Sequence, residues 1–88
     1  MAAPSPVSCT QDIWNLIATN VTDGTIVIVG RPSSMCVWTY VLTGAAAPLD
    51  ADETNASVII NDQPFSFDAA VDLYFKPKHA DAEVSVWV

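Results

Sequence analysis

Thr25-Ile26-Val27-Ile28-Val29 and Met35-Cys36-Val37-Trp38-Thr39-Tyr40-Val41-Leu42 are the two stretches that decide the fold of this 88-residue chain. Both are filled with β-branched and aromatic side chains, which favour pleated strands. The glycine and proline of residues 30–34 separate them. Because side chains alternate along a strand, the second stretch presents one face with Val37, Thr39 and Val41 and another with Cys36, Trp38, Tyr40 and Leu42. Apolar groups on both faces predict a central strand, or one whose outer face meets a partner.

Further strand signals lie on both sides of these stretches. Segment 12–18 fits either a helical stripe or a strand face, and the poor helix formers of 19–22 favour the strand. Asp23-Gly24 predicts a two-residue turn of type I′, and Asn61-Asp62-Gln63-Pro64 predicts another turn. The other expected strands are 57–60, 65–67, 71–76 and 81–88. These signals predict an all-β fold, a small antiparallel sandwich or partly closed barrel of six to seven short strands.

The domain organisation follows from the composition of the N-terminal segment. Residues 1–8 are small and rich in proline, which predicts a flexible N-terminal arm. Residues 9–88 are then a single β domain. The start of the chain has neither a basic region nor an apolar core of the kind found in signal peptides, so we expect synthesis in the cytosol without export. No apolar run approaches the roughly 20 residues of a membrane helix.

The charge of the chain limits its partners. Three basic and ten acidic residues give a formal net charge of −7 and a pI near 4.1. Nucleic acid is an unfavourable partner, because phosphate binding needs clustered Lys and Arg. An anionic membrane surface would repel the chain for the same reason. The negative charge is compatible with binding to a basic surface of another protein or to a cation.

Cys9 and Cys36 are the two cysteines. Two thiols cannot complete a four-ligand zinc site within one chain. A disulfide between them would add about 3 kcal/mol of stability in an oxidising compartment. The alternative is a pair of reduced thiols with at least one in the core. Because nothing in the sequence points to an oxidising compartment, the reduced pair is favoured.

One histidine is the only conventional acid–base candidate. His79 lies in the basic turn Lys76-Pro77-Lys78-His79 between two expected strands. Catalysis would need a partnered nucleophile or carboxylate and shelter from water, which a loop tip does not provide. We therefore expect a solvated turn and no enzymatic activity.

A run of acidic residues resembles the start of a calcium loop. Asp50, Asp52 and Glu53 occupy its first positions. Asn55 and Asn61 stand where an EF-hand loop needs Gly and Glu, so the motif is incomplete. A looser cation site shared with Asp62 is the alternative. We predict no metal and no cofactor.

The aromatic residues are numerous for so small a domain. They are Trp14, Trp38, Trp87, Tyr40, Tyr74, Phe65, Phe67 and Phe75. We expect three to five of them in the core. The others would be exposed anchors of an interface, where Trp and Tyr contribute most of the binding energy. A sugar-binding platform is a third option, but it needs polar partners beside a flat ring, and the sequence does not identify them.

Five segments of strand and turn residues follow one another in the order 14–22, 25–28, 44–48, 64–67 and 71–77, within residues 14–88. Together they resemble a pattern found in small β proteins of tailed-phage virions, many of which decorate the capsid or serve as accessory subunits. The resemblance implies a non-enzymatic structural role, assembly on a capsid lattice, and a trimer or another homo-oligomer.

The leading hypothesis is a virion structural protein that binds the major capsid protein or another virion protein as a decoration subunit. Trp38, Tyr40 and Trp87 are the predicted partner-binding residues. Cys9 in the arm would pair with Cys36 or with a neighbouring chain. A phage tail component or a receptor- or carbohydrate-binding β module is the alternative. The expected location is the virion, after synthesis in the host cytoplasm.

Overall fold

The computed structural model describes residues 5–29, 35–59, 62–78 and 80–88 and confirms the all-β class. In these residues six strands form one antiparallel sheet in the order β1-β6-β2-β5-β3-β4. The strands are β1 (Val7–Cys9), β2 (Asn15–Val29), β3 (Cys36–Leu42), β4 (Ser57–Ile59), β5 (Gln63–Pro77) and β6 (Ala82–Trp87). Among the described residues, no helix has the length and apolar character needed to span a membrane.

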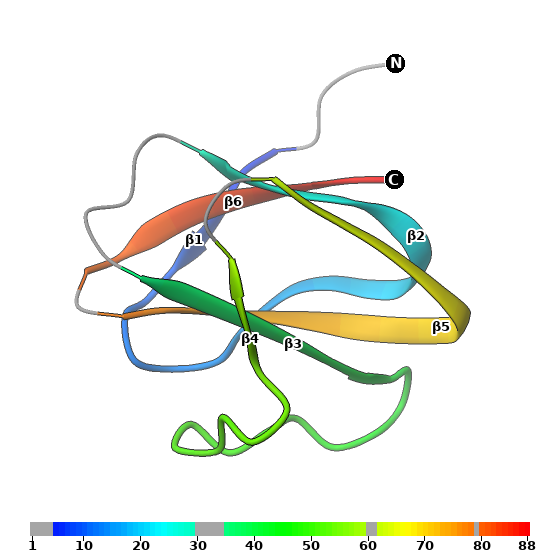
Figure 1. The fold of residues 1–88 in the computed structure, drawn as a ribbon, viewed down its shortest axis with the longest axis horizontal. Coiled ribbons are helices and arrows are strands. Elements are labelled where there is room, and N and C mark those ends of the chain that lie inside the picture. Colours follow the sequence, from blue (N-terminus) through cyan, green and yellow to red (C-terminus); the bar gives the residue numbers. More distant parts are fainter. Residues whose placement is uncertain (1–4, 30–34, 60–61, 79) are drawn as a thin grey trace.

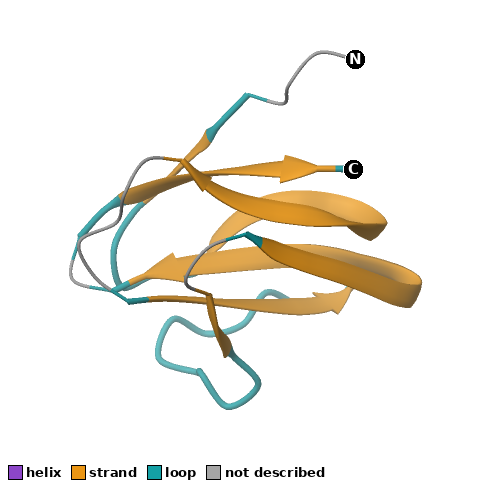
Figure 2. Cartoon of the chain, turned by 45° about the horizontal axis from the view of Figure 1, so that its top comes forward, coloured by secondary structure: helices purple, strands orange, loops and turns teal. Residues whose placement is uncertain are grey.

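The shape of the sheet is set by its two long strands. β2 and β5 are each 15 residues long and run antiparallel to each other. Both bend sharply near the middle, and the sheet curls over on itself at these bends (Figures 1 and 2). The second half of β5 lies between the first half of β2 and β3, while the second half of β2 lies between the first half of β5 and β6. One continuous sheet thereby encloses its own core.

The predicted turn at Asp23-Gly24 is wrong, because both residues lie within β2. The pairing of β2 with β5 shifts register between Leu16 and Asp23, which marks β-bulges along this stretch. Asn20 has a φ of 55°. Bulges and tight hairpins use the same residue types, since both need backbone conformations that Gly and Asn adopt easily. Asp23-Gly24 therefore marks a bend within one strand and not a hairpin turn between two strands.

Gly24 is required by a close backbone approach. A Cβ atom at this position would lie 2.2 Å from the carbonyl oxygen of Trp87 and 3.1 Å from Cζ of Phe65. No side chain fits there without displacing the backbone of β6.

The expected boundary of the N-terminal arm is also wrong. Val7 and Ser8 belong to β1, in which Val7 pairs with Val84 and Cys9 with Ala82. Val7 and Cys9 face the core, and this burial holds the segment on the sheet. Residues 1–4 of the predicted arm lie outside the described residues.

The predicted strands 65–67 and 71–76 are joined in β5, and the turn expected at 61–64 ends inside this strand. Residue 61 lies outside the described residues. The two predicted pieces are continuous because β5 folds back at its bend together with β2, and the two strands are paired on both sides of the bend (Figure 1). The strand expected at 81–88 is β6, which lies between β1 and β2.

The core has two parts, one on each side of β3. The larger part fills the curled sheet and contains Cys9, Ile17, Ile26, Cys36, Trp38, Ile59, Phe65, Val71, Leu73, Phe75 and Val84. The smaller part consists of Trp14, Val37 and Tyr74 with partly buried Val41 and Ala56. The prediction that β3 carries apolar groups on both faces because it is central is therefore confirmed for its first half. Five aromatic residues are buried, as expected: Trp14, Trp38, Phe65, Tyr74 and Phe75.

Candidate protein-docking surface

Four aromatic rings form a row that is buried at both ends and reaches the surface in its middle. Its members are Phe65, Phe67, Tyr40 and Trp38, and we call them the aromatic row. The ring centroids lie 5.9 Å apart for Phe65 and Phe67, 4.3 Å for Phe67 and Tyr40, and 6.3 Å for Tyr40 and Trp38. Phe65 and Trp38 are buried, whereas Tyr40 is 47% exposed. Tilted rings at these separations attract one another, so the core fixes the orientation of the exposed Tyr40 ring.

Leu42 extends this surface. It follows Tyr40 on the same face of β3 and is 61% exposed. The two residues belong to the end of β3 that projects beyond β4, because β4 pairs only with Cys36, Val37 and Trp38. We call Tyr40, Leu42 and the partly buried Phe67 the row end, because here the aromatic row meets the end of β3. It is a half-exposed apolar surface on a rigid support.

Trp38 does not lie on this surface, and its prediction as an exposed partner-binding residue is wrong. Only 9% of it is exposed, and it belongs to the larger core. The face that Trp38 shares with Tyr40 is covered where β4 and the opposite half of the sheet meet β3. The buried Nε1 of Trp38 has no hydrogen-bond acceptor among the described residues. An unpaired buried donor costs on the order of 1–3 kcal/mol.

Trp87 is exposed but lies apart from Tyr40. Val84 and Val86 pack on the core, so Trp87 lies on the opposite face of β6, on which Ser85 is buried. Trp87 is paired with Thr25 on this outer face and is 43% exposed. The structure therefore does not join the three predicted residues in one site. Trp87 belongs to a second surface, on the outside of β2 and β6.

The longest loop, residues 43–56, is held against the outer face of β3 by an ion cluster. Glu53 accepts hydrogen bonds from Nζ of Lys76 at 2.7 Å and from Nζ of Lys78 at 2.5 Å. Nζ of Lys76 also donates to the backbone oxygen of Asp50 and lies 5.6 Å from the centroid of the Trp14 ring. The indole Nε1 of Trp14 donates to the backbone oxygen of Asp52 at 2.9 Å. The loop is thus fixed at several points over the smaller core.

These contacts decide the role of the charged residues near the predicted calcium loop and the basic turn. The two lysines hold the pKa of Glu53 below its ordinary value through their hydrogen bonds. Lys76 is only 4% exposed, which differs from the solvated turn that the sequence predicts. No three His, Cys, Asp or Glu side chains in the described ranges gather in a metal-binding arrangement. Residue 79 lies outside these ranges.

The partners in the ion cluster could not be identified from the sequence. Lys76 occupies a strand position next to buried Phe75, and its partner Glu53 is 23 residues away in a loop. A basic residue in an otherwise apolar strand is the one hint that a buried partner exists, because lysine is rarely buried without one.

The two thiols lie buried in the larger core, at the end of β1 and at the first residue of β3, with no disulfide between them. Burial, together with the nearby Cys36, raises the pKa of Cys9 to about 11. Burial also raises the pKa of Cys36. Thiolates are therefore disfavoured in both positions, and so is reaction with oxidants or metals. The reduced pair therefore stays the favoured prediction for the two thiols.

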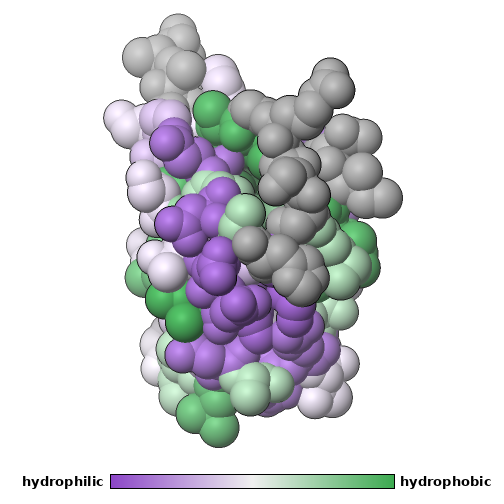
Figure 3. All heavy atoms as spheres, turned by 90° about the vertical axis from the view of Figure 1, so that its left-hand side faces the viewer, coloured by the Kyte–Doolittle hydropathy of each residue, from purple (hydrophilic) through white to green (hydrophobic). Residues whose placement is uncertain are grey.

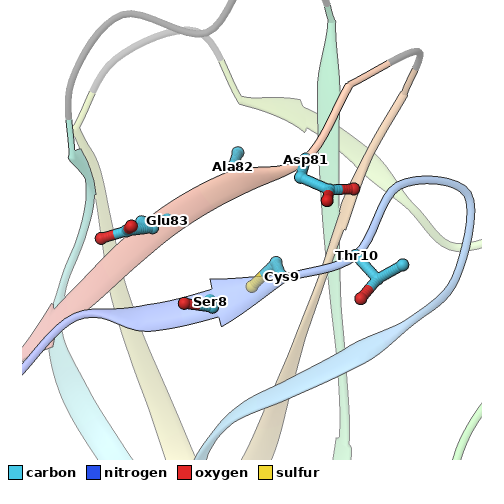
Figure 4. Close-up of a pocket in the computed structure, with 6 residues that line it drawn as sticks. All are labelled: Ser8, Cys9, Thr10, Asp81, Ala82 and Glu83. Atoms are coloured by element: carbon cyan, nitrogen blue, oxygen red, sulfur yellow. The ribbon is translucent and has the colours of Figure 1, made fainter.

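A shallow pocket of about 290 Å³ lies beside the edge strand β1. Figure 4 shows its lining from β1 and β6: Ser8, Cys9, Thr10, Asp81, Ala82 and Glu83. Ser8 and Glu83 are directly paired across the two strands. Asp81 accepts a hydrogen bond from the backbone nitrogen of Gln11 at 2.8 Å, which ties the segment after β1 to the start of β6. This carboxylate is used in holding the fold.

The end of the molecule at the turn between β5 and β6 is polar. Here the backbone nitrogen of Asp12 donates to the oxygen of Pro77 at 2.8 Å. Figure 3 shows that hydrophilic residues form the middle of the described part of this face. This end is therefore suited to contact with solvent, in contrast to the row end.

Comparison with known proteins adds no family to this geometry. No protein-family model, no curated protein and no solved structure matches the chain.

Proposed function

We propose that this chain is a non-enzymatic structural subunit of a tailed-phage virion, which binds the major capsid protein or another virion protein as a decoration subunit. The observation on which this proposal depends is the row end, where Tyr40 and Leu42 are 47% and 61% exposed on a strand whose other half is buried. The resemblance of residues 14–88 to small virion β proteins supplies the identity of the partner. The location that follows is the virion, assembled in the host cytoplasm.

The row end has the composition of an interface anchor. Tyrosine rings are enriched among the residues that dominate binding energy, because they bury a large apolar area at a low cost in conformational entropy. The Tyr40 ring is already oriented by Phe67 at 4.3 Å. A partner that covers it therefore orders no new side chain, which favours affinity.

The second surface supports assembly of the subunit with copies of itself. Trp87 and Val29 are both more than 40% exposed on the outer face of β2 and β6. Trp87 lies on the face of β6 opposite to the core residues Val84 and Val86, whereas the row end shares the core face of β3, so contact between copies through Trp87 leaves the row end free for the capsid. A trimer is the favoured oligomer, because the resemblance implies it.

Mass spectrometry of purified virions tests the proposed function. The expected result is a stoichiometric amount of this chain in the particle. Its absence from purified particles would contradict the proposal. Retention of the isolated chain on a sugar affinity column, with no copies in virions, would favour the receptor-binding alternative.

Binding to particles tests the surface itself. The pair of variants Tyr40→Ala and Leu42→Ala is expected to abolish co-sedimentation with particles that lack the subunit. Leu49→Ala is the matched control, since Leu49 is 77% exposed on the 43–56 loop and lies outside the row end. Equal loss in the control and the test variants would show that the row end is not the contact.

A further inference from the structure

The edge of β3 is open beyond β4. β5 pairs with β3 over the whole of Cys36–Leu42, whereas β4 pairs only with its first three residues. No other strand in the described part of the chain pairs with the edge that runs from Thr39 to Leu42. Open edges of this kind are templates for an additional strand.

Backbone groups of Tyr40 face this open edge. The backbone nitrogen of Thr43 donates a hydrogen bond to the backbone oxygen of Ala70 in β5. Along an antiparallel strand, the backbone N–H and C=O groups of successive residues point alternately to the two neighbouring strands. Thr43, Val41 and Thr39 therefore turn their backbone groups toward β5. Tyr40 and Leu42 turn theirs to the other side, where the oxygen of Leu42 accepts from the nitrogen of Ala45 at 2.9 Å. The N–H and C=O of Tyr40 are thus directed to where a further strand would lie.

A groove of about 160 Å³ lies between this edge and the 43–56 loop. Its lining includes Thr39, Val41, Pro48, Asp52, Asn55 and Ala56. This volume corresponds to roughly five water molecules at about 30 Å³ each. It suits one long side chain with an apolar stem, because Val41, Pro48 and Ala56 supply apolar contacts and Asp52 supplies a charge.

The charge at the groove is negative. Asp52 accepts a hydrogen bond from the backbone nitrogen of Thr54 at 3.1 Å, and this bond lowers the pKa of its carboxyl group. In the described residues the ion pairs formed by lysine are those of Lys76 and Lys78 with Glu53. The chain as a whole has a formal net charge of −7. A cationic side chain is therefore the complement of this groove.

We propose that the groove binds an extended basic segment of another protein, which adds to β3 as a strand beside Tyr40 and places a lysine or arginine at Asp52. The other face of the added strand would lie beside Tyr40 and Leu42, so its side chains there are apolar. A second copy of this chain is a poor occupant of the groove, because both of its lysines, Lys76 and Lys78, are paired with Glu53. The inference rests on the proposed function only for the identity of the partner, a virion protein with such a segment.

The test uses the full chain labelled with ¹⁵N and the capped synthetic peptide Val-Lys-Val-Lys-Val-Lys-Val at low ionic strength. The amide signals of residues 39–42 and of the 43–56 loop are expected to shift on titration. The same peptide with Glu in place of Lys is expected not to bind. A peptide that is N-methylated at alternate residues is expected to bind more weakly, because it lacks the donors that pair with β3.

Matched charge variants locate the contact. Asp52→Asn is expected to weaken binding about two- to fivefold, the range for one partly exposed ion pair. The amide of Asn keeps an acceptor for Thr54, so the loop is preserved. Asp68→Asn removes the same charge from an exposed position of β5 and is expected to leave the affinity unchanged.

Three results would overturn the inference: shifts confined to other surfaces, equal binding of the Glu peptide, or no binding at millimolar concentration. Equal affinities of Asp52→Asn and Asp68→Asn would also exclude Asp52 as the contact. These outcomes are independent of the proposed function, because virion mass spectrometry can succeed when the peptide fails, and the reverse.

Discussion

The two halves of β3 share one sequence pattern and have opposite environments. Cys36–Thr39 is buried on both faces, whereas Tyr40 and Leu42 are about half exposed or more. The alternation of apolar side chains does not change along the strand. What changes is the surroundings, because Trp38 lies in the larger core and is paired with Ser57 of β4, whereas β4 pairs with no later residue of β3. The comparison teaches that alternation predicts which residues share a face, and that tertiary contacts decide which of them are buried.

Truncating one aromatic residue in each half is the strongest way to break this comparison. Trp38→Ala is expected to lower the free energy of unfolding by about 3–5 kcal/mol, the cost of removing a large buried side chain. Tyr40→Ala should cost less than about 1.5 kcal/mol, since nearly half of its surface is already in water. Urea denaturation followed by circular dichroism measures both. Equal losses would show that the exposed half is as well packed as the buried one.

The buried half of β3 begins at Cys36, which lies near Cys9 of β1. The raised pKa values of these two thiols make the free energy of unfolding depend on pH in the alkaline range. The folded pKa of Cys9 is about 11, against an ordinary value of 9.0. Stability is complete below pH 9 and falls as pH rises toward 11, because only the unfolded chain releases the proton in this window. Two pKa units correspond to about 2–3 kcal/mol. Denaturation measured from pH 8 to 11 should show this loss, and Cys9→Ala should reduce it.

The ion cluster of Glu53, Lys76 and Lys78 covers the outer face of the buried half of β3. Breaking it is expected to lower the free energy of unfolding by less than the changes at Trp38 and Cys9. Lys76→Met is expected to cost about 1–2 kcal/mol, below the value for a fully buried pair, because Glu53 is one-third exposed and retains Lys78. The pKa of Glu53 is lowered, so its contribution is present above its ordinary pKa of 4.5 and is lost as pH falls below it. Urea midpoints from pH 7 to 3 measure this acid loss.

In Lys76→Met the loss of stability between pH 7 and pH 3 should be smaller than in the unchanged chain, because Glu53 has lost one of its two lysine partners. Lys78→Met is the control, since Lys78 is more exposed than Lys76. A larger cost for Lys78→Met would contradict the assigned order of the two lysines.

The smallest expected change in stability sharpens the comparison from the exposed side. Leu42→Ser should alter the free energy of unfolding by no more than about 0.5 kcal/mol, as is usual for exposed positions. It should nevertheless weaken binding to virion particles. Leu49→Ser, at another exposed position, should change neither quantity. A large stability loss in Leu42→Ser would mean that the row end is part of the core and not a docking surface.

The sequence was sufficient for the fold class and for the face shared by each set of β3 residues. Alternating β-branched and aromatic residues produce strands whichever sheet they join. Strand ends were less predictable. Asp23-Gly24 has the composition of a hairpin turn, and only its pairing with Phe65 and Ser66 identifies it as a bend within β2.

The candidate site was predictable only in part. Tyr40 was identified correctly as an exposed aromatic residue, while Trp38, two positions earlier on the same face, is buried. Local sequence contains no information on where β4 ends relative to β3, since the two are separated by the 43–56 loop. The same loop supplies Asp52 and Glu53, whose partners are set by tertiary contacts alone.

The position of β6 in the sheet has a consequence for biosynthesis. β6 is the last strand in the sequence, yet it lies between β1, the first strand, and β2. Among the described strands β1 therefore has no hydrogen-bonding neighbour until β6 has been synthesised. Folding is limited by pairing between segments that are distant in the sequence, and it is expected to be slow for a domain of this size.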